Sequence, residues 1–291
     1  EGFATYFDLL WKEESKGRDE FHWALRAEAV GYFREDSARY RRSIVTQKRN
    51  APIDIFDSHL YNKGAWVVHM LRLRVGEASF RKALNAYLVA HGEGHVETSD
   101  WRRALEDASG IDLRTMFEQW VESGGHPEIR GDASWDPEKG EVVLKLSQTQ
   151  KTDATTPLFD VSLPIRSSQG ERRHEETVRL TGKEGVYRLK TGFRPERVVV
   201  DPGGGVLKTL GLDRPPEWIR SQLRHEDEAL ARAQAASDLA DSGHPAAVPD
   251  LGRALLEDEF WGVRQAAAQA LGKIRSTGAR DALLAGISDD H

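Results

Sequence analysis

The spacing of hydrophobic residues changes twice along the chain, and this pattern predicts three structural units. Up to about residue 127, apolar side chains recur every three to four positions, which is typical of amphipathic helices. Between 128 and 212 they alternate with polar residues, which is typical of half-buried strands. From 213 onward the helical spacing returns. The predicted fold is therefore a multidomain α+β arrangement with units at 1–127, 128–212 and 213–291.

The first unit is predicted to be helical throughout, apart from an irregular basic segment at 35–55. Helices are expected at 1–14, 19–34, 62–75, around 80–88, after a cap at 98–100, and at 112–122. Phe3, Phe7, Leu10 and Trp11 share one face of the first helix and are expected to be buried.

The second unit is predicted to be an antiparallel β-sandwich. Val142, Leu144 and Leu146 alternate with polar neighbours, and the same pattern recurs in five further short segments. Turn-forming residues at 136–140 and 167–171 separate pairs of these segments. Six or seven short strands at this spacing favour a sandwich. The Pro-rich stretch 214–216 that follows is expected to be a linker.

The third unit contains an internal repeat of helices. Identical or similar residues recur at an offset of 32 positions, as in Arg232 with Arg264 and Leu239 with Leu271. Alanines around 266–271 supply the small side chains that closely stacked helices need. The pattern resembles short HEAT-type repeats and predicts an α-helical solenoid. The chain stops where a further repeat would begin, and we expect both of its ends to be cut from a longer protein.

Composition narrows the functional classes. The chain has 291 residues, no cysteine and a formal net charge of −6. The acidic balance argues against nucleic acid as a partner, and no apolar run is long enough to span a membrane. Disulfides, thiolate chemistry and cysteine-based zinc sites are excluded. The sequence does not indicate a compartment.

The strongest candidate for chemistry lies where polar residues give way to the apolar helix at 62–75. Tyr61 stands at this junction, followed by Lys63 and Gly64. A phenol held by rigid backbone can donate a hydrogen bond to a developing oxyanion. The alternative is a tyrosine that only packs at the start of a helix.

Two other charged motifs admit functional and structural interpretations. Arg41 and Arg42 could meet a substrate carboxylate, although a basic loop cluster is more often solvated. His91 and His95 flank Glu93, but metalloprotease helices place the Glu directly after the first His. Gly92 and Gly94 interrupt a helix here, so this segment is predicted to be a loop.

Three segments resemble, in the same order, motifs of the aminopeptidase N family of zinc metallopeptidases, the gluzincin aminopeptidases. The first, Glu1-Gly2-Phe3-Ala4, is similar to the end of the family's Asn-Glu-Gly-Phe-Ala helix. The second, Tyr61-Asn62-Lys63-Gly64-Ala65, is similar to its Tyr-x-Lys-Gly-Ala segment. The third is similar to its closing helices and comprises Trp101, Leu105, Ile111-Asp112-Leu113, Phe117, Gln119-Trp120, Gly125 and Pro127.

This resemblance implies that 1–127 is the helical lobe of a thermolysin-like catalytic domain, braced by the sandwich. Glu1 would be the third zinc ligand, and Tyr61 the catalytic hydroxyl that stabilises the oxyanion. The family's other two ligands lie upstream on a His-Glu-x-x-His helix, which this chain does not contain. The intact parent would bind Zn²⁺ and hydrolyse N-terminal residues from peptides, an inference that rests on the tyrosine segment alone because the amine-recognition motif is also missing. The chain alone is expected to bind no zinc and to be inactive, since one carboxylate is a poor zinc site.

Two alternatives stay open. The parent could be a non-catalytic scaffold with the same architecture, which an intact upstream His-Glu-x-x-His helix would argue against. The chain could also be an interaction module whose HEAT-like tail binds a protein partner. The orientation of Arg232 and Arg264 bears on this second alternative, because outward-facing arginines would favour a binding surface. Internal pairing is the commoner arrangement.

Overall fold

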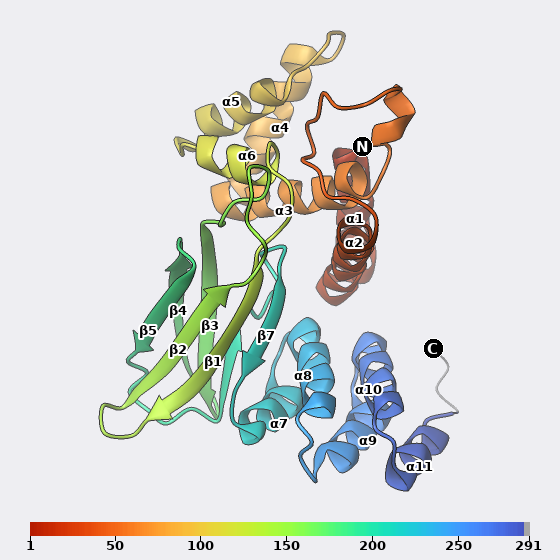
Figure 1. The fold of residues 1–291 in the computed structure, drawn as a ribbon, viewed down its shortest axis with the longest axis vertical. Coiled ribbons are helices and arrows are strands. Elements are labelled where there is room, and N and C mark those ends of the chain that lie inside the picture. Colours follow the sequence, from red (N-terminus) through yellow and green to blue (C-terminus); the bar gives the residue numbers. More distant parts are fainter. Residues whose placement is uncertain (288–291) are drawn as a thin grey trace.

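A computed structural model describes residues 1–287, and it confirms the multidomain α+β class (Figure 1). A helical lobe is followed by two packed sheets and then by a row of paired helices. The elements of the lobe are α1 (Gly2–Lys16), α2 (Arg18–Ala38), a 3₁₀ turn (Pro52–Ile55), a π-helical turn (His59–Lys63), α3 (Gly64–Val75), α4 (Glu77–His91), α5 (Thr98–Ser109) and α6 (Arg114–Trp120). No helix within the described range is long and apolar enough to cross a membrane.

The predicted buried face of α1 is partly wrong. Tyr6 and Leu9 are buried, whereas Phe7 and Trp11 are 40% and 69% exposed. The hydroxyl of Tyr6 lies 3.1 Å from Nδ1 of His69 on α3. Packing against α3 therefore buries the face of α1 that carries Tyr6 and Leu9, and leaves the neighbouring face with Phe7 and Trp11 exposed.

Helix α2 is longer than predicted and takes in the first residues of the segment expected to be irregular. Its last turn is stabilised by tertiary contacts, because Asp36 is buried there. The carboxylate of Asp36 accepts hydrogen bonds from Tyr32 at 3.2 Å and from Nε of Arg41 at 2.8 Å. A local sequence pattern does not contain these contacts.

Seven strands form the sandwich, as the alternating pattern predicts. They are β1 (Glu128–Asp136), β2 (Glu141–Gln148), β3 (Val161–Gln169), β4 (Arg172–Leu180), β5 (Glu184–Leu189), β6 (Arg197–Val200) and β7 (Thr209–Asp213). One sheet has the strand order β5-β2-β1-β7 and the other β4-β3-β6. Val142, Leu144 and Leu146 are buried, and the core of the sandwich is continuous with that of the lobe.

The prediction of a purely antiparallel sandwich is wrong at one edge. Strand β7 pairs in parallel with β1, and Glu128 lies opposite Thr209. The other strand pairs are antiparallel. The chain thus returns beside the first strand before it enters the third unit.

The tail consists of α7 (Pro216–His225), α8 (Ala229–Asp241), α9 (Ala247–Glu257), α10 (Trp261–Lys273) and α11 (Thr277–Ala285). Helices α8 and α10 begin 32 residues apart, in agreement with the sequence repeat. Arg232 and Arg264 each donate from Nη1 to backbone carbonyls five and six residues earlier. Arg232 also pairs with both carboxylate oxygens of Asp258 at 2.8 and 2.9 Å, so it faces inward.

The stretch expected to be a linker is part of the folded tail. Pro216 is the first residue of α7, where a missing N–H costs nothing. Arg214 donates to Gln222 and Asp238. Helix α7 packs on β6, so the repeats are seated directly on the sandwich.

The tail also contacts the lobe. The ring of Trp23 on α2 packs edge-on against Phe260 and Trp261, with centroids 5.8 and 5.7 Å away. The indole N–H of Trp261 donates to Glu20 at 2.6 Å. In Figure 1, the top of α10 accordingly lies below the lower ends of α1 and α2.

Candidate active site

Glu1 and Tyr61 are sixty residues apart in sequence, and a contact between two glycines brings them together. Gly2 begins α1 and Gly64 begins α3. A Cβ atom on Gly2 would lie 2.6 Å from the carbonyl carbon of Gly64, so the two backbones meet where no side chain fits. The carboxylate of Glu1 lies close enough to the Tyr61 hydroxyl to influence its pKa. Partial burial, and then the hydrogen bond to Glu1, raise the pKa of Tyr61.

Tyr61 lies in a single π-helical turn, which we call the π segment (His59–Lys63). The N–H of Lys63 donates to the carbonyl of Ser58, five residues earlier, at 2.9 Å. Such turns are rare and often occur at functional sites. The extra residue in the turn changes the direction in which Tyr61 points relative to a regular start of α3.

The N-terminal end of the π segment is fixed by Asp57. Its Oδ1 accepts the backbone N–H groups of His59 and Leu60 at 3.0 and 3.1 Å. Arg42 binds both oxygens of this carboxylate, at 2.5 and 2.8 Å, and Tyr40 donates to it at 2.8 Å. These contacts lower the pKa of Asp57 although burial opposes them. Asp57 is thus held as a charged cap.

The C-terminal end of the π segment is fixed by Lys63, which is fully buried. Its Nζ donates to the carbonyl of Ser123 at 3.0 Å and lies 5.9 Å from the centre of the Tyr32 ring. Burial lowers the pKa of Lys63 to about 7, although the Asp36 carboxylate opposes this effect. A buried amine below a half-exposed tyrosine is unusual and needs a reason.

Two buried histidines, His59 in the π segment and His126 outside it, complete a polar layer with Asp36 and Asp57. The ring nitrogens of His59 lie 3.5 Å from the carboxylates of Asp36 and Asp57. His126 lies 3.8 Å from Asp36, and burial lowers its pKa to about 4. Burial alone would raise the pKa of Asp36, but contacts with His59 and Arg41 outweigh it and lower the pKa.

The structure answers the question about Arg41 and Arg42. Each pairs with a buried carboxylate of the chain, Arg41 with Asp36 and Arg42 with Asp57. The expectation of solvation in a loop is therefore wrong, whereas contact with a substrate carboxylate stays a prediction. The two arginines hold the polar layer that supports Tyr61.

The histidine motif at 91–95 does not form a metalloprotease helix. Helix α4 ends at His91 and a loop follows, as predicted. Across residues 1–287, no group of three or more His, Cys, Asp or Glu side chains is arranged to hold a metal ion. Glu1 is therefore a single candidate ligand, which further ligands would have to complete.

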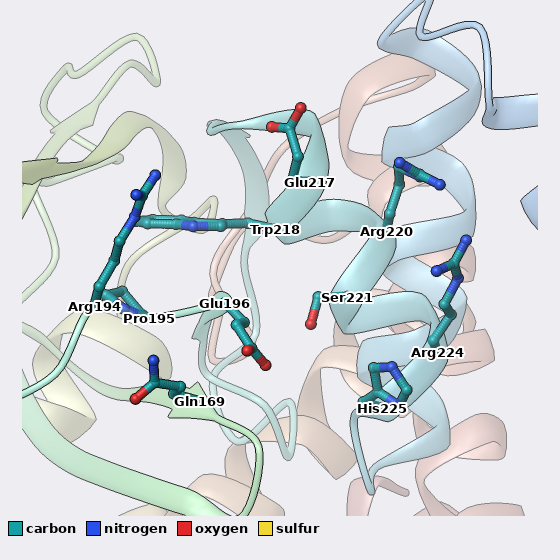
Figure 2. A pocket seen from close by; sticks show the side chains of 10 residues that line it. All are labelled: Gln169, Arg194, Pro195, Glu196, Glu217, Trp218, Arg220, Ser221, Arg224 and His225. Carbon is teal, nitrogen blue, oxygen red and sulfur yellow. The ribbon is translucent and has the colours of Figure 1, made fainter.

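A cavity of about 450 Å³ lies elsewhere, between the sandwich and α7 (Figure 2). Arg194, Arg220 and Arg224 are among its lining residues, but Tyr61 is not. Figure 2 shows Arg220 and Arg224 directed away from the opposite wall of the cavity, and both pair with Asp250 on α9. The two guanidinium groups thus share one carboxylate, and this cavity is separate from the candidate site.

Comparison with known proteins identifies two segments of the chain. Residues 1–120 match the peptidase family M1 domain, and residues 216–291 match HEAT repeats. Residues 1–120 belong to peptidase family M1. The M1 segment contains both Glu1 and Tyr61. The resemblance to the aminopeptidase N family, with a HEAT-like tail, is confirmed.

The relatives of this chain are longer proteins. Aminopeptidase N of Streptomyces lividans is 33% identical over 246 residues, which cover 80% of this chain and 27% of that protein. Tricorn protease-interacting factor F2 of Thermoplasma acidophilum is 33% identical over 132 residues, 44% of this chain and 17% of that protein. The chain thus spans between 17% and 27% of these curated relatives.

A solved structure shares the fold of nearly the whole chain. Aminopeptidase A of Legionella pneumophila, in complex with aspartic acid, matches with a TM-score of 0.73 and 15% sequence identity. The match covers 98% of this chain and 34% of that one. The lobe, the sandwich and the tail therefore follow one another as in that protein.

Sequence reasoning missed most of the groups that support Tyr61. Asp36 lies on α2, His59 in the π segment itself and His126 in the loop before β1, and nothing in their local sequence connects them. The sequence shows Gly2 directly after Glu1 and Gly64 directly after Lys63, but it does not show that the two glycines are in contact. A glycine at the first position of each of two helices is the signal that could have suggested close packing.

Proposed function

We propose that the protein to which this chain belongs is a zinc-dependent aminopeptidase that removes N-terminal residues from peptides. Tyr61 donates a hydrogen bond to the oxyanion of the tetrahedral intermediate, and Glu1 is one of the zinc ligands. The observation that carries this proposal is the meeting of Glu1 and Tyr61 at the Gly2–Gly64 contact. Family membership of residues 1–120 supports the same chemistry.

The described residues supply one of the ligands that a catalytic zinc site needs. Catalytic zinc takes three protein ligands and keeps a fourth position open. Glu1 offers one carboxylate, and no cluster within 1–287 offers the others. When bound, zinc would polarise the scissile carbonyl. We therefore propose that the 291-residue chain alone does not hydrolyse peptides, and that the two other ligands come from outside it.

The contribution of Tyr61 follows from its protonation. An oxyanion donor must carry its proton at working pH, and a tyrosine phenol, whose ordinary pKa is about 10, is neutral there. Glu1 orients the hydroxyl in the absence of substrate. The rigid attachment of the π segment then holds the hydroxyl oxygen in place, so little reorganisation is needed when charge develops.

The test uses the intact parent protein and the 291-residue chain side by side. In the parent, Tyr61→Phe should lower kcat by about 10² to 10³-fold, the usual effect of removing one oxyanion donor. Glu1→Gln should lower the zinc content, measured by atomic absorption. The chain alone should show neither stoichiometric zinc nor peptidase activity. Full activity of Tyr61→Phe, or zinc-dependent hydrolysis by the chain, would refute the proposal.

A second function concerns the tail. Leu256 on α9 and Leu284 on α11 are 55% and 57% exposed, and Ile287 is 78% exposed. Single exposed apolar side chains are common on protein surfaces, but on a helical repeat they are candidate contact points for a partner protein. The inward pairing of Arg232 with Asp258 removes the argument from outward-facing arginines. A partner protein that the wild-type chain retains in a pull-down, and that Leu284→Lys loses, would support an interaction role in addition to catalysis.

A further inference from the structure

Tyr61 and Lys63 lie on opposite sides of the π segment. Successive residues of a helix are rotated by about 100°, and slightly less in a π turn, so residues two apart point in nearly opposite directions. The structure agrees, because Tyr61 is only partly buried while Lys63 is 0% exposed. The side chain of Lys63 is therefore the inward counterpart of the hydroxyl.

The partner of Lys63 is itself immobilised. The acceptor is the backbone carbonyl of Ser123, which directly follows the α6 region. The next residue, Gly124, donates its N–H to the carbonyl of Thr155 in the sandwich at 2.8 Å. A side-chain acceptor could rotate, but this carbonyl is fixed by the chain on both sides. Lys63 thus connects the π segment to the junction between lobe and sandwich.

Folding alone does not account for an amine at this position. Burying a primary amine is unfavourable, and an apolar chain of similar length would fill the space without that penalty. The amine adds one thing that an apolar chain lacks, which is a directional N–H···O bond. Directional bonds specify a unique position, whereas apolar packing tolerates small rotations.

We infer that Lys63 is a positioning residue: its bond to the Ser123 carbonyl fixes the rotation of the π segment and thereby the place of the Tyr61 hydroxyl. This inference rests on the proposed function, since it assigns a purpose to holding that hydroxyl. Asp57 fixes one end of the segment and Lys63 the other. Loss of either anchor leaves Tyr61 able to rotate about the remaining one.

The first test is spectroscopic and uses the 291-residue chain. The chain has six tyrosines, which can be labelled with ¹³C at the ring carbon that carries the hydroxyl. Tyr61→Phe assigns the Tyr61 signal. In Lys63→Met this signal should shift or split, while those of Tyr87 and Tyr187 stay in place. An unchanged Tyr61 signal would overturn the inference.

A control separates positioning from general stability. Leu105→Val removes a buried methylene from α5 and destabilises the same lobe. It should leave the Tyr61 signal where it is in the wild-type chain. A shift of equal size in Leu105→Val and Lys63→Met would mean that any loosening of the lobe moves Tyr61, and it would overturn a specific role for the amine.

Chemical rescue tests the amine itself. Because the chain has no cysteine, Lys63→Cys introduces a single thiol. Alkylation with 2-bromoethylamine in denaturant, followed by refolding, gives a side chain of nearly the length and charge of lysine. The wild-type Tyr61 signal should return. Alkylation with a propyl group, which lacks the amine, should not restore it, and restoration by the propyl group would refute the inference.

Kinetics of the intact parent distinguish this inference from the proposed function. Lys63→Met should lower kcat by about 10 to 100-fold, with KM within about twofold, because the misplaced hydroxyl acts in the transition state. If Tyr61→Phe keeps full kcat, the proposed function fails. If Tyr61→Phe loses activity while Lys63→Met keeps the wild-type kcat, only the role of Lys63 fails.

Discussion

Replacing Gly2 with alanine is expected to push the start of α1 away from α3 and to separate Glu1 from Tyr61. The new Cβ would lie 2.6 Å from the carbonyl carbon of Gly64 and 3.0 Å from the backbone nitrogen of Ala65. These are backbone atoms, so they cannot rotate away as a side chain could. Ordinary carbon contacts begin near ~3.5 Å, so the two helices must separate by roughly 0.9 Å at this point.

The magnitude follows from two opposing effects. Overpacking costs about 1–3 kcal/mol, and alanine gains at most about 1 kcal/mol over glycine in a helix. Gly2 is the first residue of α1, where the gain is small, so Gly2→Ala should destabilise the lobe by about 1–2 kcal/mol. Gly64→Ala should be milder, because its Cβ would lie 3.0 Å from Cα of Gly2 and 3.6 Å from its nitrogen.

Native-state hydrogen exchange of amides in α1 and α3 would measure this effect locally. The control is Gly272→Ala on α10, where the residue is exposed and a Cβ meets nothing within 4 Å. It should stabilise its own helix by about 0.5–1 kcal/mol. If the amides of α1 exchange as slowly in Gly2→Ala as in the wild-type chain, or if the substitution stabilises α1 as Gly272→Ala stabilises α10, the close contact between Gly2 and Gly64 is refuted.

Three further predictions concern charged groups. Arg232→Ala leaves the buried Asp258 carboxylate unpaired and should cost about 3 kcal/mol in chemical unfolding, whereas Arg280→Ala, on the surface, should cost less than about 0.5 kcal/mol. Lys63 has a pKa of about 7 when folded against 10.5 unfolded, so unfolding takes up a proton between these pH values. Stability should therefore rise with pH by about 1.4 kcal/mol per unit across that window, and Lys63→Met should abolish the slope. His126 has a folded pKa of about 4 against 6.5, so its contribution is lost as pH falls from 6.5 to 4. His126→Gln should flatten acid unfolding in that range, and an unchanged slope would contradict its burial in the neutral form.

The order of the three units and most of their elements could be predicted from the sequence. Alternation places Leu144 and Leu163 in the sandwich core, and both are fully buried. The 32-residue repeat predicts the pairing of α8 with α10. These patterns are visible because a single periodicity decides which face of an element is buried.

The errors arise where contacts distant in sequence override that periodicity. Strand β7 has no clear alternation of buried and exposed residues, so its parallel pairing could not be predicted. Phe7 and Trp11 are exposed because α3 selects a different face of α1. Lys63 is the clearest case at the site, since lysine is normally exposed and its sequence gives no sign of burial.

The parallel pairing of β1 with β7 also decides how the molecule would carry mechanical tension. The N–H of Thr209 donates to the carbonyl of Pro127 at 3.2 Å, so the chain returns to the point at which it left the lobe. A pull between lobe and tail would enter β1 at its N-terminal end and leave β7 at its C-terminal end. Because the two strands run in the same direction, the ladder from Glu128 to Asp132 is loaded in shear, all of its bonds together. Strands β2 to β6 lie outside this path. The short β1–β7 ladder therefore bears the force, while the strands between them in sequence carry no load.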